Sequence, residues 1–214
     1  VHTGDTDTAL RFPAVNTFTV ETAGSERIRI DSDGRVMIGQ TSSVVPFMVT
    51  ATASNFGGMV MTGVLGDATS YASGVGGGLT LSGKYNSGGS QVGFAAIRGL
   101  KENGTDGNYN GALTLNTRPN GGNMTERARI DSSGRLMIGT TDASQFNSSA
   151  DDFVISRAGH AGITIDATSS TNSSVFFADG PTGTEAYRGY VQYSHSSDEL
   201  RLGAAGADQV QITS

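Results

Sequence analysis

Short alternating runs of apolar and polar residues follow one another along the chain, separated by clusters of Gly, Ser, Asn and Asp. Alternation with a period of two is typical of a half-buried β-strand, and the clusters are typical of turns. No window of twelve or more residues places apolar side chains at helical spacing between caps, so we expect little or no helix. The predicted strands are 17–21, 26–30, 36–38, 47–50, 59–62, 79–81, 92–97, 112–116, 127–130, 136–138, 153–156, 162–166, 174–177, 187–193, 199–202 and 209–212.

One string of fourteen residues occurs twice. Glu26–Gly39 (ERIRIDSDGRVMIG) returns 100 residues later as Glu126–Gly139 (ERARIDSSGRLMIG), with eleven positions identical. A truncated third copy, Asp208–Ser214, aligns with the first seven residues of the string. Self-similarity at a fixed period indicates an array of modules. The predicted modules are residues 1–39 and 140–214, both partial, and 40–139, which is complete and closes in the second copy.

The string predicts a β-hairpin with a three-residue loop, in which Gly34 and its counterpart Gly134 take the left-handed position. This loop pairs Ile30 with Val36 and Ile28 with Ile38, and it places the arginines and the methionine on the opposite face. A two-residue turn would mix the two faces, and register is strongly specified wherever one face is buried. The predicted apolar face consists of Ile28, Ile30, Val36 and Ile38 in the first copy and Ala128, Ile130, Leu136 and Ile138 in the second.

This apolar face needs a packing partner, because a lone two-stranded hairpin is only marginally stable in water. The partner is either the rest of the module or the same hairpin in neighbouring chains around an axis. The second alternative explains why the string is constant while the sequence between copies varies. With 31 glycines and no tryptophan among 214 residues, each module also has few large side chains to bury. We therefore expect several chains to pool their apolar surface.

Composition excludes several functions. The net charge is −6, with 14 basic and 20 acidic residues, so the chain lacks the basic surface that nucleic acids require. Without cysteine there is no disulfide and no thiolate metal site. The longest apolar stretch, Val44–Val49, is too short to span a bilayer, so we expect no membrane insertion.

Glu126–Thr141 and Glu26–Thr41 resemble the repeat E-R-x-R-I-D-S-x-G-x-x-x-I-G-T-T of tail fibres and related appendages of tailed bacteriophages. Gln40 stands where threonine is usual, and Met37 and Met137 stand where the family often has glycine or valine. The resemblance implies an all-β, elongated homotrimeric fibre in the virion. It also implies contacts with other virion proteins and with a glycan or protein receptor on the host surface.

Several residues invite a chemical interpretation. The loop at Asp31–Gly34 begins like a calcium loop, but the distal glutamate is absent and we interpret it as a turn. The three histidines share no ligand spacing, so neither a metal nor another cofactor is expected; they are His2, His160 and His195. No strained nucleophile turn precedes a serine, which argues against a hydrolase built around His195.

The adjacent acids Asp151–Asp152 and Asp198–Glu199 would point to opposite faces of a strand, so neither is a ready acid/base couple for glycan cleavage. Two loop tyrosines, Tyr85 and Tyr109, lie in sequence rich in Gly and Asn and are the receptor candidates. We expect a structural, non-enzymatic segment of a phage tail fibre that mediates host attachment. A bacterial surface adhesin of similar modules and a tailspike-type polysaccharide depolymerase stay open as alternatives.

Overall fold

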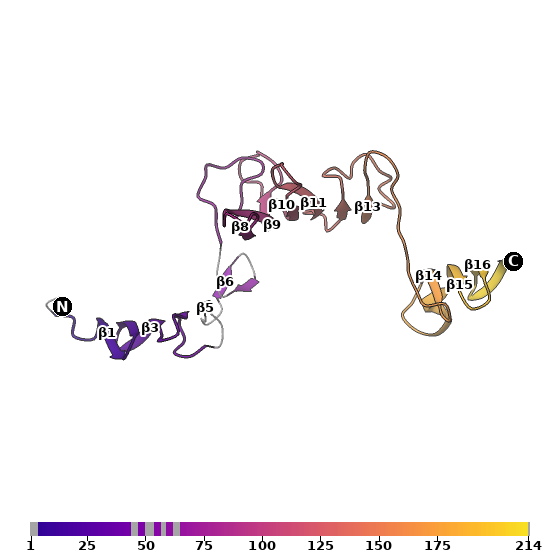
Figure 1. Ribbon diagram of the computed structural model, residues 1–214. Helices are drawn as coiled ribbons and strands as arrows, with labels where there is room; N and C mark the ends of the chain where they lie inside the picture. The colour runs from indigo at the N-terminus through magenta and orange to yellow at the C-terminus, as the bar shows by residue number, and fades with distance from the viewer. Residues whose placement is uncertain (1–3, 44–46, 50–53, 57–58, 62–64, 214) are drawn as a thin grey trace. The chain divides into compact units, whose positions relative to one another are not determined.

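The computed structural model describes residues 4–43, 47–49, 54–56, 59–61 and 65–213 (Figure 1). The chain divides into two units, residues 1–124 and 125–214, and each is described by itself. As predicted, the protein is all-β with almost no helix, since the described residues contain a single short 3-10 helix, η1 (Gly183–Tyr187).

Unit 1 consists of antiparallel strands and one parallel addition. The strands are β1 (Ala9–Ala14), β2 (Thr17–Thr22), β3 (Ser25–Ile30), β4 (Val36–Ile38), β5 (Phe47–Val49), β6 (Ser54–Phe56), β7 (Met59–Met61), β8 (Gly78–Lys84), β9 (Gln91–Lys101) and β10 (Gly111–Thr117). The first five form one sheet in chain order, with β5 parallel to β4. Strands β6 and β7 form a separate hairpin. Strand β9 pairs with β8 along one edge and with β10 along the other.

Unit 2 repeats one feature of unit 1, a hairpin that is extended by a parallel strand. Its strands are β11 (Thr125–Ile130), β12 (Leu136–Ile138), β13 (Phe153–Ile155), β14 (Asn172–Phe177), β15 (Gly189–Ser194), β16 (Glu199–Ala204) and β17 (Ala207–Ile212). Strand β13 adds in parallel to the β11–β12 hairpin, as β5 adds to β3–β4. The last four strands form an antiparallel meander in chain order.

The predicted hairpin is confirmed in both copies. Ile28 pairs with Ile38, Arg29 with Met37 and Ile30 with Val36. The loop closes through the Gly34 N–H, which donates to the Asp31 carbonyl at 2.9 Å. Gly34 has a φ of 77° and Gly134 a φ of 83°, the left-handed conformation that a three-residue hairpin loop requires at its last position.

The truncated third copy has the same backbone frame as the first. In the first copy Val20 pairs with Ile28, and the β2–β3 ladder has a bulge directly after Val20. In the third, Leu202 pairs with Val210, and the bulge follows Leu202. The turns before the two copies are Ala23-Gly24 and Ala205-Gly206, and all four of these residues have positive φ. The repeat therefore begins upstream of the string, at a two-residue turn that the sequence comparison missed.

One strand prediction is wrong, and the sheets do not end where the strings end. Residues 162–166 form no strand and pair with none among the described residues. The limits drawn at residues 39 and 139 stay predictions as module boundaries. However, β5 and β13 follow these limits in sequence and still join the sheet of the preceding hairpin. A parallel strand is joined to its partner by a long connection and not by a tight turn, so no local sequence signal predicts its pairing.

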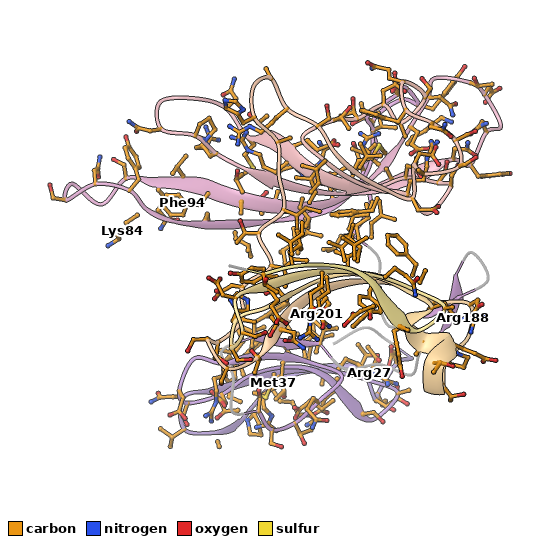
Figure 2. All side chains as sticks on the ribbon, turned by 90° about the vertical axis from the view of Figure 1, so that its right-hand side faces the viewer. Arg27, Met37, Lys84, Phe94, Arg188 and Arg201 are labelled. Atoms are coloured by element: carbon orange, nitrogen blue, oxygen red, sulfur yellow. The ribbon has the colours of Figure 1, made fainter. Side chains whose placement is uncertain are left out.

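The fully buried apolar side chains lie on the face opposite the isoleucines. Met37 has no exposed surface and Met137 has 1% (Figure 2 labels Met37). Met137 forms a small core with Ala143, from the loop after the hairpin, and Val154 of β13. The alternation along the string places both methionines on the arginine face, but it does not identify them as core residues.

Met137→Ala should lower the free energy of unfolding by about 2–5 kcal/mol, because it removes the largest side chain of this small core. Ile138→Ala is the matched comparison. Ile138 follows Met137 in β12 but lies on the other face, where its side chain is 40% exposed. We expect its effect to depend on protein concentration, whereas that of Met137→Ala should not. Urea unfolding at two protein concentrations measures both, and concentration-independent losses of equal size would contradict this assignment.

Candidate assembly face

Apolar side chains form continuous rows across one face of the β1–β5 sheet. One row contains a residue from every strand: Leu10, Val20, Ile28, Ile38 and Val49. The next row is Phe18, Ile30, Val36 and Phe47. Five side chains in these rows are between 37% and 69% exposed: Leu10, Ile30, Ile38, Phe47 and Val49. Phe12 of β1, beside the rows, is 80% exposed.

Three further groups of paired strands show the same feature. The rows are Ile130, Leu136 and Phe153 on β11–β13; Leu79, Ile97 and Leu115 on β8–β10; and Val175, Val191, Leu202 and Val210 on β14–β17. All ten of these side chains are at least 38% exposed. We call these rows the apolar faces of their sheets.

The apolar faces of the hairpins stay partly exposed within a single chain. No element among the described residues of either unit covers them enough to bury their large side chains. Contiguous exposed apolar surface of this kind marks an interaction site in soluble proteins. The predicted face residues are therefore brought together on the surface, as neighbours in register, and not in the core of a single chain.

The polar face of the hairpin, in contrast, is satisfied within the chain. The Arg29 guanidinium donates to both carboxylate oxygens of Glu26 at 2.6 Å. This bidentate bond raises the pKa of Arg29, an effect that its burial partly opposes. The equivalent pair in the second copy, Arg129 and Glu126, is joined at 2.7 and 3.0 Å. The arginine and the glutamate of the string thus form one bidentate ion pair in each copy, which explains why they recur together.

A second polar element, the loop clasp, consists of Asp131 and Arg135 in the second copy. Oδ1 of Asp131 accepts the backbone N–H of Ser133 at 2.9 Å and of Arg135 at 3.0 Å, while Oδ2 accepts Nε of Arg135 at 2.7 Å. Burial raises the pKa of the Asp131 carboxyl, but these hydrogen bonds outweigh burial and hold it below its ordinary value. Asp151, one of the predicted adjacent acids, accepts Nη1 of Arg135 at 2.9 Å. Asp31 and Arg35 form the same clasp in the first copy.

The two receptor candidates lie in different hollows of unit 1. Tyr85 lines one of about 620 Å³ together with Phe94 and the loop 118–123 (Figure 2 labels Phe94). That loop is held by Arg118, which donates to the carbonyls of Gly93 at 2.8 Å and Gly122 at 2.7 Å. Tyr109 is 97% exposed and borders a separate hollow of about 340 Å³. The structure therefore does not bring these tyrosines into one site.

The loop that presents Tyr109 is tied down by a lysine. The ammonium of Lys101 donates to the carbonyls of Thr105 at 3.0 Å and Asn108 at 2.6 Å. The side-chain amide of Asn103 also donates to the Asn108 side chain at 3.0 Å. These bonds cross the loop, so the exposed ring projects from an ordered backbone.

The residues with catalytic or metal-binding potential stay apart. No group of three His, Cys, Asp or Glu side chains within the described ranges could hold a metal ion. His2 lies outside these ranges, and His160 is exposed. Nε2 of His195 lies 2.9 Å from Oγ of Ser173, but that hydroxyl donates to the carbonyl of Ile165 at 2.9 Å. The serine hydroxyl has one proton and two possible acceptors at 2.9 Å, so the carbonyl competes with the histidine for it.

The second predicted acid pair is also divided between separate bonds. Asp198 accepts the phenol of Tyr193, and this bond raises the pKa of the tyrosine. Glu199 accepts the guanidinium of Arg201, which lowers the pKa of the glutamate. Neither carboxylate faces the other across a cleft in the described residues.

No family model and no curated protein matches the chain. No helix of the described residues is long and apolar enough to cross a membrane.

Asp131→Asn should lower the free energy of unfolding by about 1–3 kcal/mol at pH 7, because it weakens charge-assisted hydrogen bonds of a side chain that is 5% exposed. The folded pKa lies below the value of about 3.9 for an unfolded aspartate. Its stabilising effect is therefore complete above about pH 4 and is lost as the pH falls through the folded pKa. Urea unfolding between pH 7 and pH 2 should show the gap between variant and parent closing in acid.

The matched control is Asp33→Asn. Its side chain is 64% exposed, and serine stands at the equivalent position of the second copy. We expect little change in the free energy of unfolding. An equal loss from both substitutions, or a gap for Asp131→Asn that persists in acid, would contradict the role of the clasp.

Proposed function

We propose that this chain is a structural, non-enzymatic segment of a phage tail fibre, in which three copies associate through their apolar faces and present receptor-binding loops to the host. The observation that carries the proposal is the pair of opposed faces on the repeated hairpin. One is closed by ion pairs within the chain, and the other is an exposed apolar row in register with its neighbouring strands.

The energetics favour burial of these faces by association. Covering a side chain the size of Ile30 or Ile130 contributes about 1.5–3 kcal/mol when it is removed fully from water. These two residues are still 39% and 43% exposed in the single chain, so a large part of that contribution is left for assembly. Rows of this kind recur on β1–β5, β8–β10, β11–β13 and β14–β17, which suits a long interface better than a small docking patch.

The number of copies comes from the resemblance of the string to phage fibre repeats, because a single chain does not specify the symmetry of its assembly. Three chains in a closed ring satisfy a repeated heterologous contact without forming an open filament. Three copies of each loop also raise the apparent affinity for a multivalent receptor by raising the effective concentration of linked sites.

Recognition belongs to the loops that differ between repeats. The loop 102–110 is rich in Asn and Gly and displays Tyr109, a composition that resembles that of antibody binding loops. Tyr85 is the second candidate. The loop 118–123 beside it replaces the two-residue turns found before the first and third copies, and insertions in repeat proteins map to loops on a binding face.

Ile30→Asp combined with Ile130→Asp should abolish the trimer. Burying an unpaired carboxylate in an apolar interface costs several kcal/mol for each ion. Mass photometry should show a species of about three times 22.0 kDa for the parent protein and a monomer for the variant. The multimer of the variant should stay below one tenth of the parent value.

A control for added charge is Thr41→Asp combined with Thr141→Asp, at exposed sites directly after the same two hairpins. This variant should remain trimeric. A parent protein that is monomeric at all concentrations would contradict the proposal, and an intact trimer in the isoleucine variant would show that the apolar face is not the interface.

A further inference from the structure

Residues 161–166, between β13 and β14, have the pattern of a strand but no strand partner. Ile163 and Ile165 alternate with Gly162, Thr164 and Asp166, and the backbone lies in neither a helix, a strand nor a turn. Among the described residues, no backbone N–H of this segment donates a hydrogen bond, and the one bond to its backbone comes from the hydroxyl of Ser173 to the carbonyl of Ile165. Unpaired N–H and C=O groups become a template for pairing with another chain once such a segment adopts a strand conformation.

The apolar side chains of this segment are also uncovered. Ile163 is 66% exposed and Ile165 is 46% exposed. Ile163 borders an open hollow of about 380 Å³ together with Phe153 and Ile155. The register of β12 and β13 places these last two residues on the apolar face of the β11–β13 strands. The segment therefore continues that face, and the hollow between them is lined by apolar side chains on both sides.

We propose that residues 161–166 pair as a β-strand with a second copy of this chain. Apolar side chains of that second copy fill the hollow beside β13. A second copy is the occupant that the surface fits, because its own faces carry the same rows of exposed Ile, Leu, Val and Phe. The segment carries no charge except Asp166 at its end, so it offers no pattern for an oppositely charged partner. Main-chain pairing would add affinity, and the alternating isoleucines would set the register.

This inference rests on the proposed function, since it requires that the chains assemble. It goes further in assigning a main-chain contact to a segment outside the repeated hairpins. It also explains why a sequence that alternates like a strand is unpaired in a single copy. Its partner strand is supplied by another copy, just as the packing partner of the apolar face is.

Hydrogen–deuterium exchange of the full 214-residue protein, followed by mass spectrometry, tests the pairing. In the trimer, peptides that contain residues 161–166 should exchange at least about tenfold more slowly than an unpaired chain. Thr164→Pro removes one N–H and fixes φ, so it should return the segment to the exchange rate of an unpaired chain. Ser148→Pro is the control, because residue 148 is the second residue of a turn closed by the Ala150 N–H and the Asn147 carbonyl, where proline is favoured.

The outcomes separate the two proposals. Slow exchange in the trimer that becomes fast on dilution to monomer supports strand pairing between copies. A trimer in which the segment exchanges fast overturns the strand pairing and leaves the proposed function intact. Slow exchange that persists in the monomer also overturns it, because the pairing would then lie within one chain. A protein that is monomeric at every concentration overturns both.

Discussion

The division of each repeated hairpin into two faces is the constraint on which the rest of the structure depends. Its polar face is complete in one chain, because the Arg29–Glu26 pair and the Asp31–Arg35 clasp find their partners within a few residues. Its apolar face has no such local partner. Successive side chains along a strand point to opposite faces, so the groups that close the polar face cannot cover the apolar one. The conformation of the hairpin is therefore specified locally, but two strands alone are only marginally stable in water.

This constraint accounts for the small size of the core. The core side chains of unit 2 are Met137, Ala143 and Val154, held between β12, β13 and one loop. A methionine fills an irregular space under a loop more readily than a branched side chain does, because its three rotatable bonds adapt to the gap. The apolar surface that an ordinary domain would place in its core lies here on the open faces of the sheets.

The loops vary without disturbing these faces because they are anchored to strand backbone. Arg118 fastens one loop to the carbonyl of Gly93 in β9, and Lys101 at the end of β9 fastens another. Each loop thus carries its own hydrogen bonds and needs no help from the side chains of the apolar rows. A repeat built in this way can change its loops while the apolar rows stay constant.

The hairpin register, its glycine loop and the all-β class could be predicted from sequence because they rest on interactions between near neighbours. Pairing Ile28 with Ile38 is the arrangement that sorts the side chains into two consistent faces, and the structure has this pairing. The burial of Met37 was missed because the cover comes from outside the hairpin. The strand predicted at residues 162–166 failed as an element of one chain because alternation reports a capacity to pair, not the presence of a partner.

The sequence by itself therefore determined the repeat, the turn chemistry and the sorting of each strand into a polar and an apolar side. Only the tertiary structure decided which side is buried within the chain, which loop covers Met137, and that Tyr85 and Tyr109 lie in different hollows. The physical reason is the range of the interactions. Turns and strand registers depend on residues a few positions apart, whereas burial depends on elements that meet only after the chain has returned on itself.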